Sequence, residues 1–265
     1  MSSATLRARR RLVLALVAVA LVAPVLLAGA RWPSWWAWIA PEQTPMTWLQ
    51  SVALVLAAAA ALLSAHVLRL AVPYTATDDA DGVDGADPTN RGATSGATPW
   101  RLLAAGLAAL AIDERFALHE RVRDGVLAPR DVTVPFLPWV GPGDFLLLAV
   151  GVVGLAALPM VWRAIGPDTG ARRALLAGVA LAIVAVGMDS IDPSTWTTRA
   201  ERIEQTAEEV IELGSALALL AAVTLRLLGL LDTSAADTPP EHRPPRGAAA
   251  TADRTASQEP VTPQG

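Results

Sequence analysis

The 265-residue chain has no cysteine. It has no lysine either, because all 21 of its Lys and Arg residues are arginine. Without cysteine it can form no disulfide, cysteine–zinc site or thiol nucleophile. Without lysine it can have no Walker A loop, Schiff-base chemistry or Ser-Lys dyad. Charged residues make up only 17% of the chain, against ~25% in a typical soluble domain. The net charge of -4 argues against a nucleic-acid partner, because binding to a phosphate backbone needs a basic surface.

Hydrophobic residues make up 53% of the chain and fall in six long runs. These runs cover about 12–30, 46–71, 100–122, 143–163, 174–192 and 206–231. A helix needs ~20 apolar residues to cross a ~30 Å hydrocarbon core. All nine tryptophans lie at or near the ends of the runs, where the ring suits the headgroup layer. The sequence therefore predicts an all-α polytopic membrane helix bundle of about six transmembrane helices over 12–231.

Arginine predicts the orientation of these helices. It is concentrated in the basic N-terminus, residues 1–11, and in the short connection between the fourth and fifth runs. Because positive residues favour the inner side, we expect a cell-membrane protein with both termini in the cytoplasm. In an alternative interpretation, residues 1–30 are a cleaved signal peptide, because the first run leads to the small residues Ala28-Gly29-Ala30.

Two segments have the composition of disordered chain. Residues 73–99 and 232–265 are rich in Asp, Thr, Ala, Gly and Pro and poor in large apolar side chains. Such segments bury too little surface to offset the entropy of ordering. We expect a disordered cytoplasmic loop at 73–99 and a disordered cytoplasmic tail at 232–265.

Carboxylates that interrupt the apolar runs are the main functional signal, because charge inside a membrane is costly and marks functional sites. On a continuous helix, Asp113 and Glu120 share one face, and Glu208 and Glu212 belong to one acidic stripe. Counted at ~1.5 Å per residue, Asp113, Asp189 and Glu212 reach nearly the same depth. We therefore predict a site for a cation or for protons in the outer half of the bilayer, formed by Asp113, Glu120, Asp189, Glu208 and Glu212.

Other polar residues are expected to support this site. They are Glu114, Arg115, His119, Asp192 and Ser215. Ser215 is expected to bond its own helix backbone, and Glu209 to point away from the stripe, toward the side of Arg202. Cofactors are unassigned, except that His119, Asp113, Glu208 and Glu212 form a candidate set of ligands for a divalent metal ion.

Three short motifs resemble a pattern found in bacterial multi-pass integral membrane proteins of unknown activity. The motifs are Asp113-Glu114, His119-Glu120 and Glu208-Glu209-x-x-Glu212. The resemblance covers about residues 100–230. It implies about six helices and supplies no activity.

Three functions are compatible with these features. The first is a small cation or proton-coupled transporter that uses the carboxylates as its ion site. The second is a membrane-embedded, metal-dependent hydrolase acting on a lipid or envelope substrate. The third is a non-catalytic membrane scaffold, in which Arg115, Arg121 and Arg123 pair with the acids to hold the helices together. The expected partners are membrane lipids, and the sequence specifies no protein partner.

Overall fold

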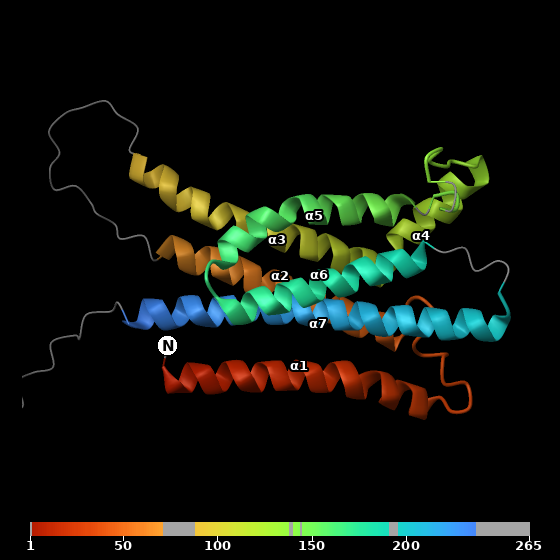
Figure 1. Cartoon of the computed structure of the whole chain (residues 1–265), viewed down its shortest axis with the longest axis horizontal. Coiled ribbons are helices and arrows are strands. Elements are labelled where there is room, and N and C mark those ends of the chain that lie inside the picture. The colour runs from red at the N-terminus through yellow and green to blue at the C-terminus, as the bar shows by residue number, and fades with distance from the viewer. Residues whose placement is uncertain (1, 71–87, 138–139, 144, 191–195, 237–265) are drawn as a thin grey trace, which may run out of the picture.

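The computed structural model describes residues 2–70, 88–137, 140–143, 145–190 and 196–236, and within them it contains helices and no strand (Figure 1). The long helices are α1 (Ser3–Ala30), α2 (Pro45–Leu70), α3 (Pro88–Phe116), α5 (Phe145–Ile165), α6 (Thr169–Asp189) and α7 (Thr198–Ala236). Three short helical segments follow α3: α4 (Leu118–Val122), a π-helical turn η1 (Arg123–Leu127) and a 3-10 turn η2 (Ala128–Arg130). The all-α prediction is confirmed.

The surface of the bundle is strongly apolar. Five helices, α1, α2, α5, α6 and α7, are long and apolar enough to cross a membrane. Large side chains such as Leu21 and Val153 are 67% and 69% exposed, and extensive apolar surface of this kind suits lipid rather than water. The sixth long helix, α3, is not among the five, because its uncharged stretch between Arg101 and Asp113 is shorter than ~20 residues. The fold is therefore a helical membrane bundle, as predicted.

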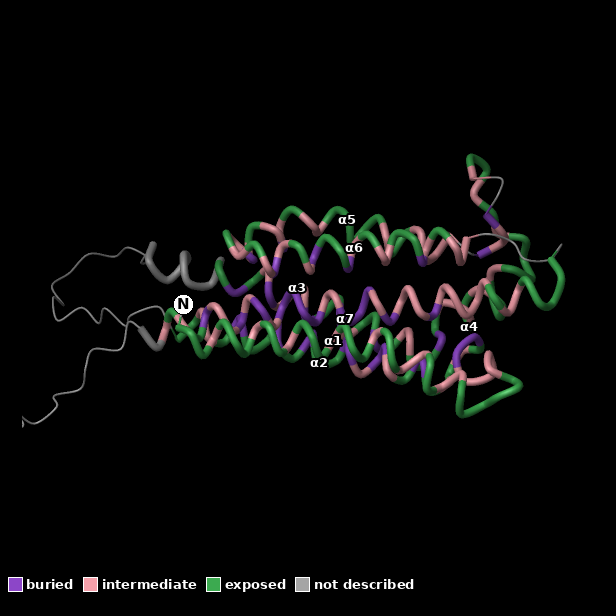
Figure 2. Tube along the Cα trace, turned by 60° about the horizontal axis from the view of Figure 1, so that its bottom comes forward, coloured by how far each residue is buried: buried purple, intermediate pink, exposed green. Residues whose placement is uncertain are grey.

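The core lies where α2, α3, α6 and α7 meet. Helix α2 packs along both α3 and α7, and α6 packs along α7 (Figure 2). The inner face of α2 is rich in buried alanines, including Ala53, Ala57 and Ala61, and small residues let helix backbones approach closely. Helix α1 rests on α7 and has no buried residue of its own, and α5 packs against α6 and α3. The inner four helices therefore build the frame for the site.

Helices α6 and α7 pack closely at Gly178. A Cβ atom at this position would lie 2.9 Å from Leu219 Cγ, which is closer than real Cβ contacts. One turn of helix away from this contact, the Ser215 hydroxyl donates a hydrogen bond of 2.9 Å to the Gly178 carbonyl. The predicted bond of Ser215 to its own helix is therefore wrong, since its hydroxyl joins two helices instead.

Several helix boundaries differ from the predicted ones. The run 100–122 is not one helix, because α3 ends at Phe116 and Ala117 has a positive φ of 46°. Helix α3 begins at Pro88, so the second part of the segment 73–99, expected to be disordered, is helical, while 73–87 lie outside the described residues. Helix α7 continues to Ala236, into the predicted tail, and 237–265 lie outside the described residues.

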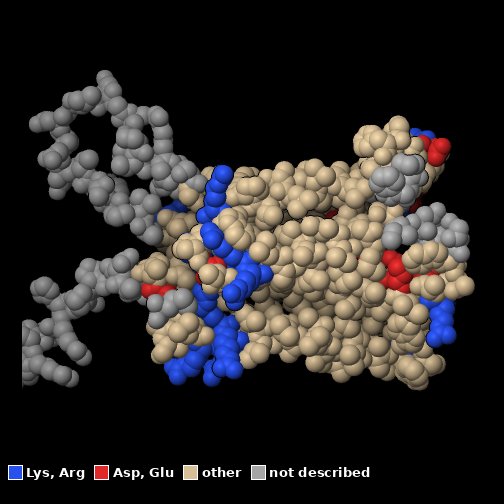
Figure 3. Space-filling view, viewed as in Figure 1, with Lys and Arg blue, Asp and Glu red and all other residues tan. Residues whose placement is uncertain are grey.

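The described ends of the chain lie together. Helix α1 starts at the end of the bundle where α7 finishes (Figure 1), and the Thr5 hydroxyl donates a hydrogen bond of 2.6 Å to Asp232. At the same end, Arg9 forms two hydrogen bonds with Asp168, the residue that caps α6. Figure 3 shows the larger group of arginine side chains at this end and acidic groups at the opposite end.

Candidate functional site

Three carboxylates from two helices converge inside the bundle. One oxygen from each of Glu114, Glu209 and Glu212 lies within 4.8 Å of the other two. Glu114 lies in the last turn of α3, and Glu209 and Glu212 lie three residues apart on α7, a spacing that puts both on one side of a helix. Glu209 is only 4% exposed. We call Glu114, Glu209 and Glu212 the carboxylate cluster.

Gln50 brings α2 to the carboxylate cluster. Its side chain is 1% exposed, and its Nε2 donates to the Glu209 backbone carbonyl at 2.8 Å and to the Glu209 carboxylate at 3.0 Å. A longer contact of 3.5 Å reaches Glu212. The amide oxygen, Oε1, is buried and has no hydrogen-bond partner among the described residues. A buried acceptor without a donor is costly, so this oxygen is available to bind a ligand.

Arginine does not neutralise the carboxylate cluster. Among the described residues, no arginine lies within ion-pair distance of Glu114, Glu209 or Glu212. Two arginines make cation–π contacts instead. Arg115 lies 5.9 Å from the Phe116 ring centroid, and Arg202 lies 4.1 Å from the Trp36 ring centroid. Because several like charges cannot share a poorly hydrated site without compensation, the cluster requires protons or a cation.

Glu42 lies just outside the cluster, in the connection between α1 and α2. Its charge acts on the carboxyl groups of Glu114, Glu209 and Glu212. Burial, followed by the charge of Glu120, raises the pKa of Glu42 to about 7. This carboxyl group therefore exchanges its proton near neutral pH, beside the cluster.

Asp113 turns the chain at the end of α3. Its carboxylate accepts the backbone N–H of His119 at 2.8 Å and lies 2.9 Å from Nδ1 of the same residue. These bonds span the left-handed residue Ala117, where α3 stops and α4 begins. Burial alone would lower the pKa of His119, but the hydrogen bond and charge of Asp113 outweigh it and raise that pKa. Asp113 and His119 therefore form a pair that favours the charged imidazole.

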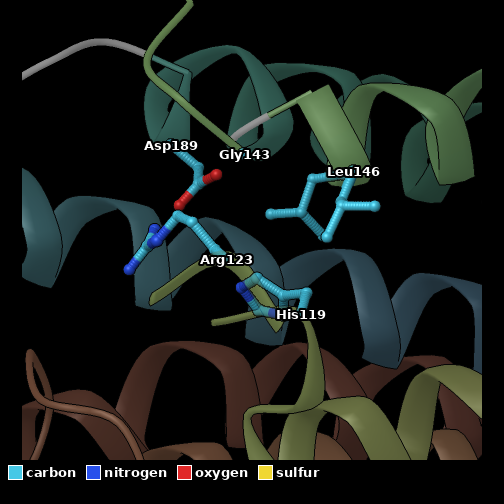
Figure 4. Close-up of a pocket in the computed structure, with 6 residues that line it drawn as sticks. His119, Arg123, Gly143, Leu146 and Asp189 are labelled. Carbon is cyan, nitrogen blue, oxygen red and sulfur yellow. The ribbon is translucent and has the colours of Figure 1, made fainter. Parts of the chain in front are cut away.

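A shallow hollow lies beside this pair. It is lined by His119, Arg123, Gly143, Leu146, Leu147 and Asp189 (Figure 4). Arg123 is the first residue of the π-helical turn and lies 3.3 Å from the Glu120 carboxylate. Gly143, at φ +91°, would place a Cβ 2.8 Å from Arg123 Cγ, so the chain is closely packed here. The hollow has no room for a water-sized molecule.

The predicted site residues fall into three groups. Glu212 lies in the carboxylate cluster, and so does Glu114, which was expected only to support it. Glu208 lies one turn from Glu212, and the charges of Glu212 and Asp189 act on its carboxyl group. Asp113, His119, Glu120 and Asp189 lie around the hollow instead, and Asp192 lies outside the described residues. Of the four predicted metal ligands, only Glu212 belongs to the cluster.

Two predictions about faces were wrong for a physical reason. Asp113 and Glu120 do not share a face, because the left-handed Ala117 interrupts the helix between them. Glu209 does not point away from the site, because residues three apart on a helix are neighbours and α2 supplies an amide for Glu209.

Sequence reasoning missed Gln50 and Glu42. Gln50 had a detectable signal, since it is a long polar side chain within the apolar run 46–71, where a polar group needs a partner. Glu42 had none, because a carboxylate in a connection between two helices is ordinarily solvated.

The chain belongs to a protein family described as a domain of unknown function (DUF8692), whose model matches residues 3–227. No curated protein and no solved structure matches the chain. The matched range includes all residues of the carboxylate cluster, Gln50, Glu42 and the Asp113–His119 pair.

Proposed function

We propose that this protein is a multi-pass membrane protein that binds a hard cation at the carboxylate cluster in exchange for protons, as a small cation or proton-coupled transporter does. The observation that carries the proposal is the convergence of three carboxylates, one buried and two half-buried, with the unpartnered Gln50 oxygen, and no arginine of the described part of the chain within ion-pair distance of them. Carboxylate and amide oxygens are the ligands that hard cations prefer.

The ligands of the cluster suit a cation such as Ca²⁺. One oxygen from each carboxylate lies within 4.8 Å of the other two, so an ion equidistant from the three would lie at most about 2.8 Å from each, a range that includes the 2.3–2.6 Å of Ca²⁺–oxygen bonds. Ca²⁺ accepts carboxylate and amide oxygens in flexible geometry, whereas Mg²⁺ demands near-ideal octahedral geometry and keeps several of its waters.

Protons are the counterpart of the cation. Without an ion, Glu114, Glu209 and Glu212 reduce their repulsion by taking up protons, and an arriving divalent ion would displace them. Glu42, with a pKa of about 7 raised mainly by burial, is suited to accept a displaced proton and pass it to water. Binding and proton release would then be linked.

The interruption of α3 supports a transport role. Transporters often bind ions where a helix is interrupted, and Glu114 lies three residues before the break at Ala117, although α3 is not itself one of the five apolar spans. The orientation we propose follows the arginines: the end that carries residues 1–11 and both described chain ends is cytoplasmic. The carboxylate cluster then lies nearer the outer surface of the cell membrane.

The other two functions receive less support from the site. A hydrolase acting on a lipid would need space for its substrate, and the hollow beside His119 has no room for a water-sized molecule. Of the arginines that a scaffold would use to tie the acids of different helices together, Arg115 lies over the Phe116 ring, and Arg123 pairs with Glu120 and Asp124, which belong to its own short segment of the chain.

Cation binding can be measured on the purified full-length protein in lipid nanodiscs by calorimetry with Ca²⁺ and with Mg²⁺. We expect Ca²⁺ to bind with release of protons, detected as a dependence of the heat on buffer ionisation. Glu212→Gln and Glu114→Gln each remove a charged ligand and should weaken Ca²⁺ binding at least tenfold, about 1.4 kcal/mol. The matched control is Glu201→Gln, the same substitution in the first turn of α7, which should bind as the wild type does.

Transport is tested separately in proteoliposomes that contain a pH-sensitive dye. An imposed Ca²⁺ gradient should move protons in the opposite direction with the wild type and with Glu201→Gln, but not with Glu212→Gln. Unchanged Ca²⁺ affinity in both cluster variants would refute the ion site. Normal binding without flux would refute transport and leave a cation-binding membrane protein.

A further inference from the structure

A second polar feature lies at the opposite end of the bundle from the carboxylate cluster. Helices α1, α6 and α7 border an open groove of about 320 Å³, lined by Arg9, Arg10, Val13, Leu14, Gly170 and Leu225. Its residues come from the basic N-terminus and the next turn of α1, from the first turn of α6 and from α7. The groove is thus basic at one edge and apolar along its wall.

The two arginines of the groove have different roles. Arg9 is fixed: its guanidinium donates to both Asp168 carboxylate oxygens, at 2.8 and 2.6 Å, and to the Leu225 carbonyl, at 2.9 Å. These three bonds leave two of its five N–H donors unused. Arg10 is exposed and has no ion pair among the described residues. Arg10 is therefore free to bind an anion, and Arg9 offers a rigid second donor.

The charge around the groove remains positive after internal pairing. Asp168 neutralises Arg9, but Arg226, next to Leu225 on α7, acts electrostatically on both of them, and its buried Nε has no hydrogen-bond partner among the described residues. Arg226 is half-buried, so its charge adds to the positive potential at this end of the bundle. An anion in the groove would be attracted by that potential.

The apolar wall identifies the kind of anion. Val13 and Leu14 follow Arg10 on α1, are both exposed large apolar side chains and line the groove, so they give it an apolar wall. Basic pockets between transmembrane helices bind anionic headgroups of the inner leaflet. We propose that this groove binds one anionic phospholipid, with its phosphate at Arg10 and the free donors of Arg9 and its acyl chain along Val13 and Leu14.

The proposal is tested by native mass spectrometry of the full-length protein with equal amounts of phosphatidylglycerol and phosphatidylcholine. We expect the wild type to retain phosphatidylglycerol preferentially. Arg10→Gln should lower that preference about fivefold, which corresponds to ~1 kcal/mol for one arginine–headgroup contact. Arg10→Lys should restore most of it. The matched control, Arg121→Gln, removes an exposed arginine at the other end of the bundle and should change nothing.

Two further arms make the result decisive. Leu14→Asn leaves the charges unchanged and should also reduce lipid retention, because it makes the acyl wall polar. Inorganic phosphate at millimolar concentration should compete poorly with the lipid. Equal retention by the wild type and Arg10→Gln would overturn the proposal, as would competition by phosphate as strong as that of the lipid, which would indicate a site for free phosphate. Neither outcome bears on Ca²⁺ binding at the carboxylate cluster.

Discussion

Asp168 should stabilise the protein in two separable ways. Its carboxylate caps α6 by accepting the Ala171 N–H at 3.0 Å, and it pairs with Arg9 in a bidentate geometry. The side chains of Arg9 and Asp168 are only 12% and 11% exposed, so water compensates little when the pair is broken. Asparagine also caps helices but carries no charge. We expect Asp168→Asn to cost about 2 kcal/mol for the charged hydrogen bonds, and Asp168→Ala about 1 kcal/mol more for the cap.

The assay is thermal unfolding in lipid-free detergent of the two Asp168 variants, Arg9→Gln and the double variant Arg9→Gln/Asp168→Asn. The double variant should cost clearly less than the sum of its parts, because both single changes break the same pair. The pKa of Asp168 is lowered, because the raising effect of burial is outweighed by the hydrogen bonds from Arg9 and the Ala171 N–H together with the charges of Arg9 and Arg226. The wild type should therefore lose this stabilisation as pH falls below about 4, and Asp168→Asn should not. Additive costs in the cycle would refute the reasoning.

Three further predictions concern packing and titration. Gly178→Val should lower stability by about 1–3 kcal/mol because it overpacks the α6–α7 contact, whereas Gly151→Val, with nothing within 4 Å of the new Cβ, should be nearly neutral in the same thermal assay. Burial raises the pKa of Glu42 to about 7, so its protonation favours the folded state. Stability should fall as pH rises from about 4.5 to 7, and Glu42→Gln should make that fall shallower; an unchanged profile would contradict the assignment. Asp113 outweighs burial in raising the pKa of His119. Asp113→Asn should therefore lower that pKa, measured by NMR of the imidazole, and a pKa that does not move would show that the pair is absent.

The fold was largely predictable because it depends on lengths of apolar sequence. The runs at 46–71 and 143–163 correspond closely to α2 and α5. The break at Ala117 could not be predicted, because alanine is a strong helix former and the bonds between Asp113 and His119 that span the left-handed turn depend on the folded chain. Tertiary contacts overrode local propensity there.

The site was predictable in kind but not in membership. Carboxylates inside apolar runs indicated a buried acidic site, and Glu212 is part of one. Which other groups reach the site depends on the orientation of α2 about its axis relative to α7, and the hydrogen bonds of Gln50 to Glu209 fix that orientation. The helical faces of isolated helices do not predict it. With Gln50 hydrogen-bonded to Glu209, Glu209 becomes part of the site.

The length of α7 has a consequence for the hydration of its acids. Its 39 residues extend for about 58 Å, nearly twice the ~30 Å of a hydrocarbon core. Glu201 and Glu204, in its first two turns, are partly exposed, while Glu209, further along the same continuous rod, is 4% exposed. The hydration of these glutamates thus decreases along a single rigid helix, and no loop has to rearrange to produce that gradient.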